Sequence, residues 1–244
     1  MIRKSMLCFF ILFQFGARAG ETDSIANHVF SLIYQQDLPA AEHYLEIEKY
    51  KLSDFYYLFL NLDLHWWKYR TSNSKSDARA LEKLIDDQNR LKTVSDQEKM
   101  KRLLVKSYQL RYEKKKLNLI GMLSTRSDIQ NLINQLKPDQ LPVTSNELKL
   151  FESYVIMYEY IENINFWGFQ NNSGERQKKL HRMEEFAADE NLMLNTVARF
   201  FLARMYQKVE KEPETGLKHF KILTAKYPTN ATFAAYQKEC ESKL

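Results

Sequence analysis

"AKYPTNATFA", residues 225–234, ends one helix and begins the next. Pro228 disfavours helical continuation, since proline lacks a backbone N–H and restricts the residue that precedes it. Helix-forming residues lie on both sides, over 214–227 and 230–243. The stretch therefore predicts a hairpin of two helices joined by a short turn.

The rest of the 244-residue chain has the same helical character. Its 15 Phe, 14 Tyr and 44% hydrophobic residues argue against disorder, while six Gly and five Pro are few turn formers for a multi-stranded protein. Apolar residues recur at helical spacing along most of the sequence, which predicts about eleven helices and no strand. We expect an all-α fold.

Capping signals place several helix starts. Pro39 suits a first helical turn and Ser53 can cap a helix, whereas Ser95 with Glu98 forms a capping box. Thr144 with Glu147 forms a second box. The helix that begins near residue 96 is expected to run toward Gly121 and to be followed by a short helix over 126–137. Its partner over 74–92 is expected to face inward through Ala78, Leu81, Leu84, Ile85 and Leu91.

Two longer stretches, 53–70 and 148–167, are apolar or aromatic on several helical faces. A surface helix shows a single apolar stripe, so these two helices are expected to lie between neighbours. Such hairpins form either a compact domain or a solenoid in which each pair buries its apolar face against the next pair.

Residues 200–234 resemble a tetratricopeptide repeat. The residues that carry the resemblance are Leu202, Ala203 and Tyr206 on a first helix, Gly216 and Phe220 on a second, and Tyr227-Pro228 before a third. The small residues would let two helices approach closely. The resemblance implies stacked antiparallel hairpins forming an α-solenoid with a right-handed superhelix and no sheet, which binds a protein or peptide on its concave face without a cofactor.

The match has three departures. One extra residue separates Tyr206 from Gly216, Arg199 stands at a position that resembles the family's tryptophan, and Leu223 replaces a small residue. A fainter likeness covers residues 38–50. No clean repeat of 34 residues runs through the middle of the chain.

Residues 1–19 have the features of a signal peptide. Arg3 and Lys4 precede an apolar run over 6–15, and Ala17-Arg18-Ala19 is a small-residue cleavage pattern. We expect removal after Ala19 and export, to a periplasm first and to the extracellular space as the alternative; a buried first helix is the competing interpretation. No later run of 18 apolar residues predicts a membrane span.

The linker "PDQLP", residues 138–142, divides the predicted mature chain. A helical array over 20–140 would precede a second array over 143–244, which contains the repeat-like hairpin. The two arrays are expected to be continuous.

Basic residues are concentrated between Lys99 and Lys116, where eight Lys or Arg accompany one acid, Glu113. Apolar residues recur at helical spacing here, so a solvated face is the first interpretation and an anionic partner or surface the second; an exported protein rarely meets nucleic acid. The candidate rim residues for an anionic partner are Lys99, Arg102, Lys106, Arg111 and Lys114.

Aromatic residues gather in the two apolar helices, where core packing and a binding groove are both plausible roles. The candidate partner-binding residues are Trp66, Trp67, Tyr69, Tyr154, Tyr158 and Trp167.

Catalytic and metal-binding patterns give no candidates. The five histidines have no metal-ligand spacing, and the chain contains no nucleophile elbow, phosphate-binding glycine loop or Cys/His dyad. Cys240, the lone cysteine after residue 19, is expected to be half-buried. We therefore expect no metal, cofactor or catalytic residue.

The favoured function is an exported, non-enzymatic scaffold or adaptor that binds a protein or peptide. The alternatives are a helical enzyme or ligand-binding domain acting on envelope polymers, and a binder of anionic surfaces through residues 99–116. A scaffold would have an open concave surface without a buried ionisable cluster, whereas an enzyme would have a deep cleft where carboxylates or a histidine converge.

Overall fold

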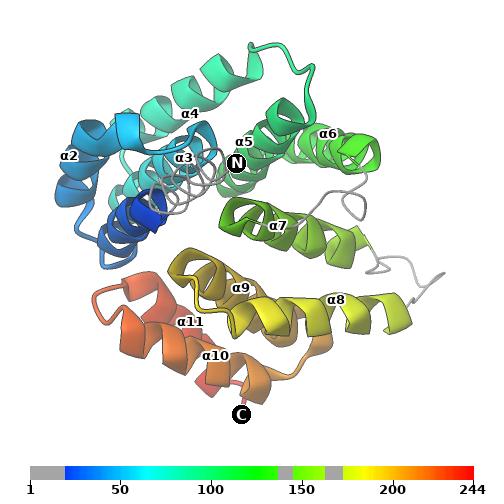
Figure 1. The fold of residues 1–244 in the computed structure, drawn as a ribbon. Helices are drawn as coiled ribbons and strands as arrows, with labels where there is room; N and C mark the ends of the chain where they lie inside the picture. Colours follow the sequence, from blue (N-terminus) through cyan, green and yellow to red (C-terminus); the bar gives the residue numbers. More distant parts are fainter. Residues whose placement is uncertain (1–19, 137–144, 163–172) are drawn as a thin grey trace, which may run out of the picture.

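The computed structural model describes residues 20–136, 145–162 and 173–244, and every regular element in these ranges is helical (Figure 1). The predicted all-α class is confirmed for this part of the chain. A first helix covers residues 20–34. The elements that follow are α2 (Leu38–Glu48), the 3-10 turn η1 (Lys49–Lys51), α3 (Asp54–Ser72), α4 (Lys75–Asn89), α5 (Asp96–Lys115), α6 (Leu119–Leu136), α7 (Asn146–Glu162), α8 (Ser173–Ala187), α9 (Leu192–Met205), the π-helical turn η3 (Tyr206–Glu210), α10 (Pro213–Lys226) and α11 (Ala231–Glu241).

Helix starts follow the capping signals. Pro39 lies in the first turn of α2, and the Ser53 hydroxyl accepts a hydrogen bond from the Tyr56 N–H at 3.1 Å. Ser95 and Glu98 form the predicted capping box of α5. At α7 the cap is Ser145, whose hydroxyl accepts from the Leu148 N–H at 3.2 Å, while Thr144 lies outside the described residues.

The break between α5 and α6 comes earlier than predicted. The helix does not continue to Gly121, because Leu117 adopts the left-handed conformation with φ 58° and ends α5. The Asn118 side chain then accepts a hydrogen bond from the Gly121 N–H at 3.2 Å, and α6 begins at Leu119. The predicted short helix is therefore longer and starts sooner.

Alternate helices form an inner row. α3 packs on α5, α5 on α7 and α7 on α9, while each even-numbered helix pairs with its sequence neighbours. α3 is buried on most of its circumference, as its apolar sequence predicts, while Tyr57, Asn61, His65 and Lys68 form one partly exposed stripe. One hydrophobic core includes residues from both predicted arrays; the predicted linker over 138–142 lies outside the described residues.

Leu91 was expected to face inward, and this is wrong: its side chain is exposed. The reason is that α4 ends at Asn89, two residues before Leu91, so the helical spacing no longer applies there. The other predicted inward residues of α4 are buried or pack against the core.

The end of the chain returns to its beginning, so the row of helices closes on itself (Figure 1). The Asn230 side chain donates a hydrogen bond to the Tyr34 carbonyl oxygen at 3.0 Å. Arg70 on α3 donates to the Tyr236 hydroxyl on α11 at 3.0 Å. The inner helices therefore surround a common centre.

The close approach predicted at Gly216 is present. A Cβ atom at this position would lie 2.9 Å from the Ala203 carbonyl oxygen, so α10 contacts the backbone of α9 directly. The π-helical turn Tyr206–Glu210 lies within the stretch where the sequence has its extra residue. A π turn is the usual way in which a helix accommodates one inserted residue. The tetratricopeptide resemblance, the solenoid and its superhelix stay predictions.

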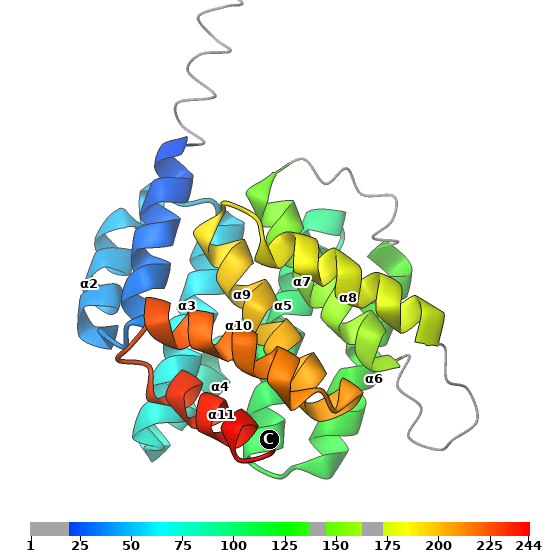
Figure 2. The same ribbon diagram turned by 90° about the horizontal axis from the view of Figure 1, so that it is seen from below.

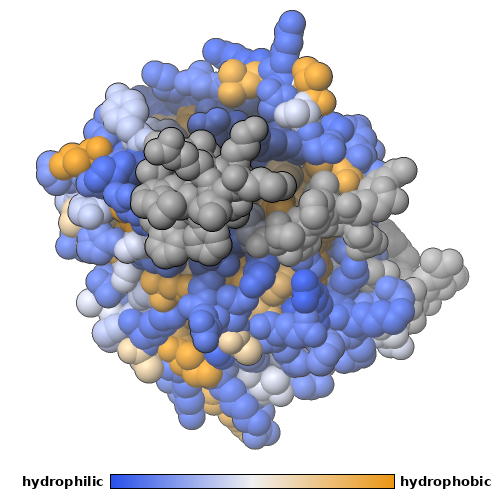
Figure 3. Space-filling model, in the orientation of Figure 1, coloured by the Kyte–Doolittle hydropathy of each residue, from blue (hydrophilic) through white to orange (hydrophobic). Residues whose placement is uncertain are grey.

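None of the described helices is both long enough and apolar enough to cross a membrane. The face drawn in Figure 3 is mostly hydrophilic, with small scattered hydrophobic areas.

Candidate ligand-binding cavity

A cavity of about 500 Å³ lies at the centre of the inner row. Every described residue that lines it belongs to the first helix, α3, α5, α7, α9 or α11. The lining consists of Tyr34, Asp63, Trp66, Trp67, Arg70, Leu110, Arg111, Lys114, Lys115, Tyr154, Met157, Tyr158, Ile161, Val197, Phe200, Phe201, Arg204, Thr232, Phe233 and Tyr236. This volume falls in the range of sites that take small molecules.

One helical spacing places most of these side chains. α3 contributes residues 63, 66, 67 and 70, α7 contributes 154, 157, 158 and 161, and α9 contributes 197, 200, 201 and 204. Residues separated by three, four and seven positions lie along one stripe of a helix. Each of these helices therefore has one stripe that faces the cavity.

Aromatic rings form most of the walls. Tyr34 meets Trp67 edge to face with ring centres 5.4 Å apart, and Tyr154 meets Phe201 in the same way at 5.3 Å. Phe233 of α11 lies 6.0 Å from the Trp67 ring, which joins the last helix to α3. These contacts fix the rings, so the walls are rigid and apolar.

Asp63 is the one carboxylate in the described lining, and its side chain is 1% exposed. Its Oδ1 atom accepts a hydrogen bond from the Tyr108 hydroxyl at 2.9 Å, and that hydroxyl lies 3.3 Å from the Tyr154 hydroxyl. Burial raises the pKa of Asp63 to about 6, although the Arg111 charge and the Tyr108 hydrogen bond act in the opposite direction. Near neutral pH Asp63 is therefore mostly a carboxylate, and its burial disfavours this charged form.

Two buried polar atoms of α3 have no hydrogen-bond partner among the described residues. They are Oδ2 of Asp63 and Nε1 of Trp67, one helical turn apart, and both residues line the cavity. An unsatisfied buried polar group is unfavourable by about 1–3 kcal/mol. A ligand group that accepts from the indole or donates to the carboxylate would remove this penalty.

Basic residues outnumber the single acid of the lining by five to one. The Arg111 guanidinium lies over the Tyr108 ring, 4.6 Å from its centre, and 5.6 Å from the centre of the Tyr154 ring. No carboxylate oxygen among the described residues lies within 4.0 Å of a nitrogen atom of Arg111, Lys114 or Lys115. These three cations therefore have no direct ion pair with a described carboxylate, although the charges of Arg111 and Asp63 interact at longer range.

The remaining two cations are anchored at the edge of the cavity. Arg70 donates to the Thr232 hydroxyl at 3.2 Å, and Arg204 pairs with Glu239 at 3.3 Å while stacking on Tyr236. Lys114 is exposed, which shows that the cavity reaches the surface there. The arrangement suits an anionic group held above an apolar body.

The structure brings six of the residues predicted as binding sites to this cavity. They are Trp66, Trp67, Tyr154, Tyr158, Arg111 and Lys114. Tyr69 packs behind the wall against Trp66 and Tyr112, and Trp167 lies outside the described residues.

The other three rim candidates lie elsewhere on α5. Lys99 pairs with Asp96 at 2.8 Å, and Lys106 pairs with Asp128 at 2.8 Å. Arg102 donates to the Asn89 carbonyl oxygen at 2.6 Å and holds the connection between α4 and α5. The basic stretch 99–116 is therefore divided, and only its C-terminal part faces the cavity.

Sequence reasoning missed Asp63, although a signal was present. It is the single acid within an apolar stretch that runs from Phe55 to Trp67. A charged residue between apolar neighbours on both sides in a helix is expected to be buried, and buried charged residues are often found at functional sites. The positions of Tyr34 and Phe233 in the cavity lining could not be predicted from local sequence, because they depend on the contact between the two ends of the chain.

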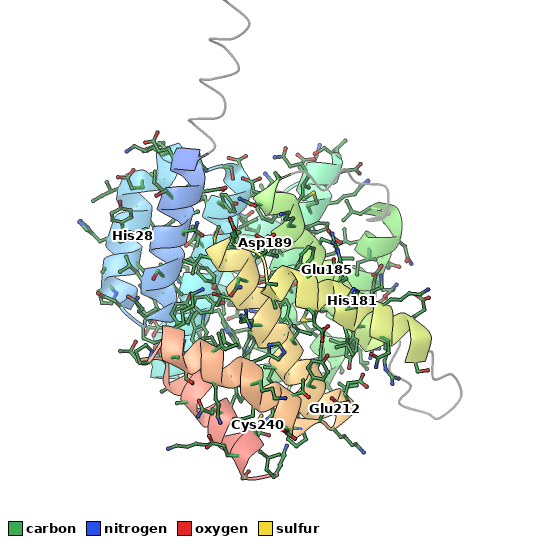
Figure 4. All side chains as sticks on the ribbon, turned by 60° about the horizontal axis from the view of Figure 1, so that its bottom comes forward. His28, His181, Glu185, Asp189, Glu212 and Cys240 are labelled. Carbon is green, nitrogen blue, oxygen red and sulfur yellow. The ribbon has the colours of Figure 1, made fainter. Side chains whose placement is uncertain are left out.

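Histidine and cysteine residues do not gather at the cavity. Figure 4 shows His28 on the first helix, His181 beside Glu185 on α8, and Cys240 on α11, all apart from one another. No group of three or more metal-ligating side chains occurs in the described ranges. Cys240 is fully buried instead of half-buried, and burial raises the pKa of its thiol.

No family model matches this chain, and neither a curated protein nor a solved structure shows a significant match to it. The cavity therefore has to be interpreted from its own chemistry.

Proposed function

We propose that the protein binds an anionic, largely apolar ligand in the central cavity. The observation that supports this most strongly is the lining itself, in which aromatic walls stand beside Arg111, Lys114 and Lys115, none of which has an ion pair with a described residue. Charge-assisted hydrogen bonds to such cations are about twice as strong as neutral ones, and the low-dielectric walls strengthen them further.

This proposal favours the ligand-binding alternative over a scaffold with an open concave face. The inner row closes between Tyr34 and Asn230, so a groove for a long partner segment is interrupted. The described lining offers one carboxylate and no histidine, whereas an acid–base enzyme needs converging titratable groups. A peptide partner fits this geometry through its chain end, since a C-terminal carboxylate on apolar residues presents the same chemistry.

We also propose export after cleavage at Ala19 and a tetratricopeptide-like pairing of the helices. The order of charge, apolar run and small residues in 1–19 supports the export. The direct contact of Gly216 with the α9 backbone supports the pairing.

The mass of the protein recovered from the producing cell tests the export, and a chain that still carries residues 1–19 would contradict it.

Titration with anilinonaphthalene sulfonate tests the binding, because the fluorescence of this aromatic anion rises in apolar sites. We expect one site per chain, and binding at least about tenfold weaker for the uncharged analogue N-phenylnaphthylamine. In Arg111→Gln and in Lys114→Gln the affinity for the sulfonate should fall while that for the neutral analogue stays the same. Lys114 is exposed and has no ion pair, so its variant is expected to fold normally.

Lys101→Gln is the matched control, because Lys101 lies on the same helix, pairs with Asp54 at 3.5 Å and does not line the cavity. Equal binding of the two probes, or equal loss in the control, would contradict the proposal. Competition by a short apolar peptide, but not by its C-terminal amide, would identify the ligand class as a peptide end.

A further inference from the structure

The turn between α5 and α6 exposes a cluster of apolar side chains. Leu117, Leu119, Ile120 and Leu123 are 82%, 70%, 83% and 69% exposed, respectively. We call these four residues the α5–α6 tip. In Figure 2 this green connection projects at the lower edge of the molecule, on the side away from residue 20 at the top.

The backbone of the tip ends α5 in a left-handed residue. The Asn118 N–H donates to the Glu113 carbonyl oxygen at 3.0 Å and the Leu117 N–H donates to that of Lys114 at 3.2 Å, which closes α5 with a Schellman motif. Leu117 occupies the left-handed position of this motif, with φ 58°. Glycine is the usual residue there, because a Cβ atom is unfavourable in this conformation. Gln36, Asn73 and Lys211 also have positive φ, but these residues are polar, whereas Leu117 exposes 82% of an apolar side chain to water, which points to a contact with something else.

Three lysines precede the tip directly in the sequence. Lys114, Lys115 and Lys116 precede the tip, and no carboxylate lies within 4.0 Å of the first two among the described residues. Lys115 donates to the Tyr69 carbonyl oxygen at 3.0 Å, and Lys116 pairs with Glu82 at 3.5 Å. The nearby acid Glu113 accepts a hydrogen bond from Asn118 at 2.7 Å. The net charge behind the tip is positive.

We propose that the α5–α6 tip docks this protein on an anionic lipid surface. Apolar side chains enter the interface between headgroups and acyl chains, and lysines one turn behind them meet the negative headgroups. A protein partner fits less well, because four side chains on a protruding turn are far fewer than the 20–30 residues per side of a standard protein interface. The proposal does not depend on the ligand proposed for the cavity.

Docking in this way would also orient the cavity. Lys114 and Lys115 belong both to the cavity lining and to the basic group behind the tip. The lining residues of α3, α5, α7 and α9 run from the middle of each helix to its C-terminal end. The cavity entrance at Lys114 would therefore lie close to the lipid surface.

Vesicle flotation with the full chain tests the proposal. We expect binding to vesicles that contain phosphatidylglycerol, little binding to phosphatidylcholine alone, and loss of binding at high salt. The double variant Leu117→Asn with Ile120→Asn should weaken binding by about tenfold or more, because both side chains lose their apolar contact with the bilayer. Asparagine tolerates the left-handed conformation, so the variant should fold.

The matched control is Leu91→Asn with Val94→Asn, two exposed apolar residues of the α4–α5 connection, which are 59% and 79% exposed. This variant should bind the vesicles like the unchanged protein. Hydrogen exchange gives a second measurement, in which anionic vesicles should protect the backbone amides of residues 117–123. Three outcomes would overturn the proposal: no binding to anionic vesicles, equal losses in both double variants, or self-association through the tip without vesicle binding.

Discussion

Asp63 is the residue whose chemistry most distinguishes this cavity from an ordinary helical core. An acid that is 1% exposed and has no ion pair with a described residue is unfavourable in a packed interior, even with the hydrogen bond from Tyr108. The sequence indicated this buried acid, since Asp63 interrupts an apolar stretch. The sequence did not show that Arg111, 48 positions later, would act on its charge, because that depends on how α3 and α5 pack.

Replacement of Asp63 by asparagine should remove a pH dependence of stability. The pKa of Asp63 is raised to about 6 in the folded protein, above its value near 3.9 when unfolded, so the folded state holds the proton more tightly. The stability that this carboxyl contributes is therefore fully present below about pH 4 and is lost as the pH rises through 6. The shift corresponds to about 3 kcal/mol.

Urea unfolding at pH 4.5, 6 and 8 measures the effect. The stability of Asp63→Asn relative to the unchanged protein should increase across this range, whereas Asp87→Asn, an exposed control, should show no such trend. A constant difference between the Asp63 variant and the unchanged protein would contradict the account.

Helix boundaries show where local sequence rules succeed. The starts of α2, α3 and α5 follow their caps, because a cap is a contact within four residues. The end of α5 was predicted too late, because a leucine in the left-handed conformation gives no local signal. Motifs that end a helix usually contain glycine at the left-handed position. Here Leu117 takes that position, and the nearest glycine, Gly121, lies four residues later, inside α6.

Gly216 tests the pairing of α9 with α10. A new Cβ atom would meet the Ala203 carbonyl oxygen at 2.9 Å, and backbone cannot move aside easily. Gly216→Ala should gain about 1 kcal/mol of helix propensity and lose about 1–3 kcal/mol to overpacking. We expect net destabilisation in chemical unfolding.

Gly121→Ala is the matched control within α6. Its Cβ would meet the ends of the Asn118 and Glu113 side chains, which can move at the cost of the Asn118 cap, instead of meeting backbone. This variant should therefore lose less stability than Gly216→Ala. If Gly216→Ala were as stable as the control, the two helices would not be in the close contact described here.

The arrangement of the helices in the whole molecule was the feature least predictable from the sequence. Periodicity identified the helices and their apolar faces, and aromatic clustering pointed to Trp66, Trp67, Tyr154 and Tyr158. Closure of the inner row depends on Tyr34, Arg70, Asn230 and Tyr236, which are separated by more than 150 positions between the two ends. No pattern within a single helix encodes such a contact, so an open surface was expected where a cavity is found.

The central claim is that this cavity is the binding site, and a variant that fills it gives the most direct test. Val197 lines the cavity from α9 and is 3% exposed. Val197→Trp should place a large ring into the cavity and leave the stability of the fold largely unchanged, because the added atoms occupy existing space.

We therefore propose to measure anilinonaphthalene sulfonate binding to Val197→Trp by fluorescence titration, with the thermal midpoint recorded in parallel. The account predicts that the affinity falls by about tenfold or more while the midpoint stays near that of the unchanged protein. Unchanged affinity in the folded variant would place the ligand elsewhere on the molecule and contradict the account.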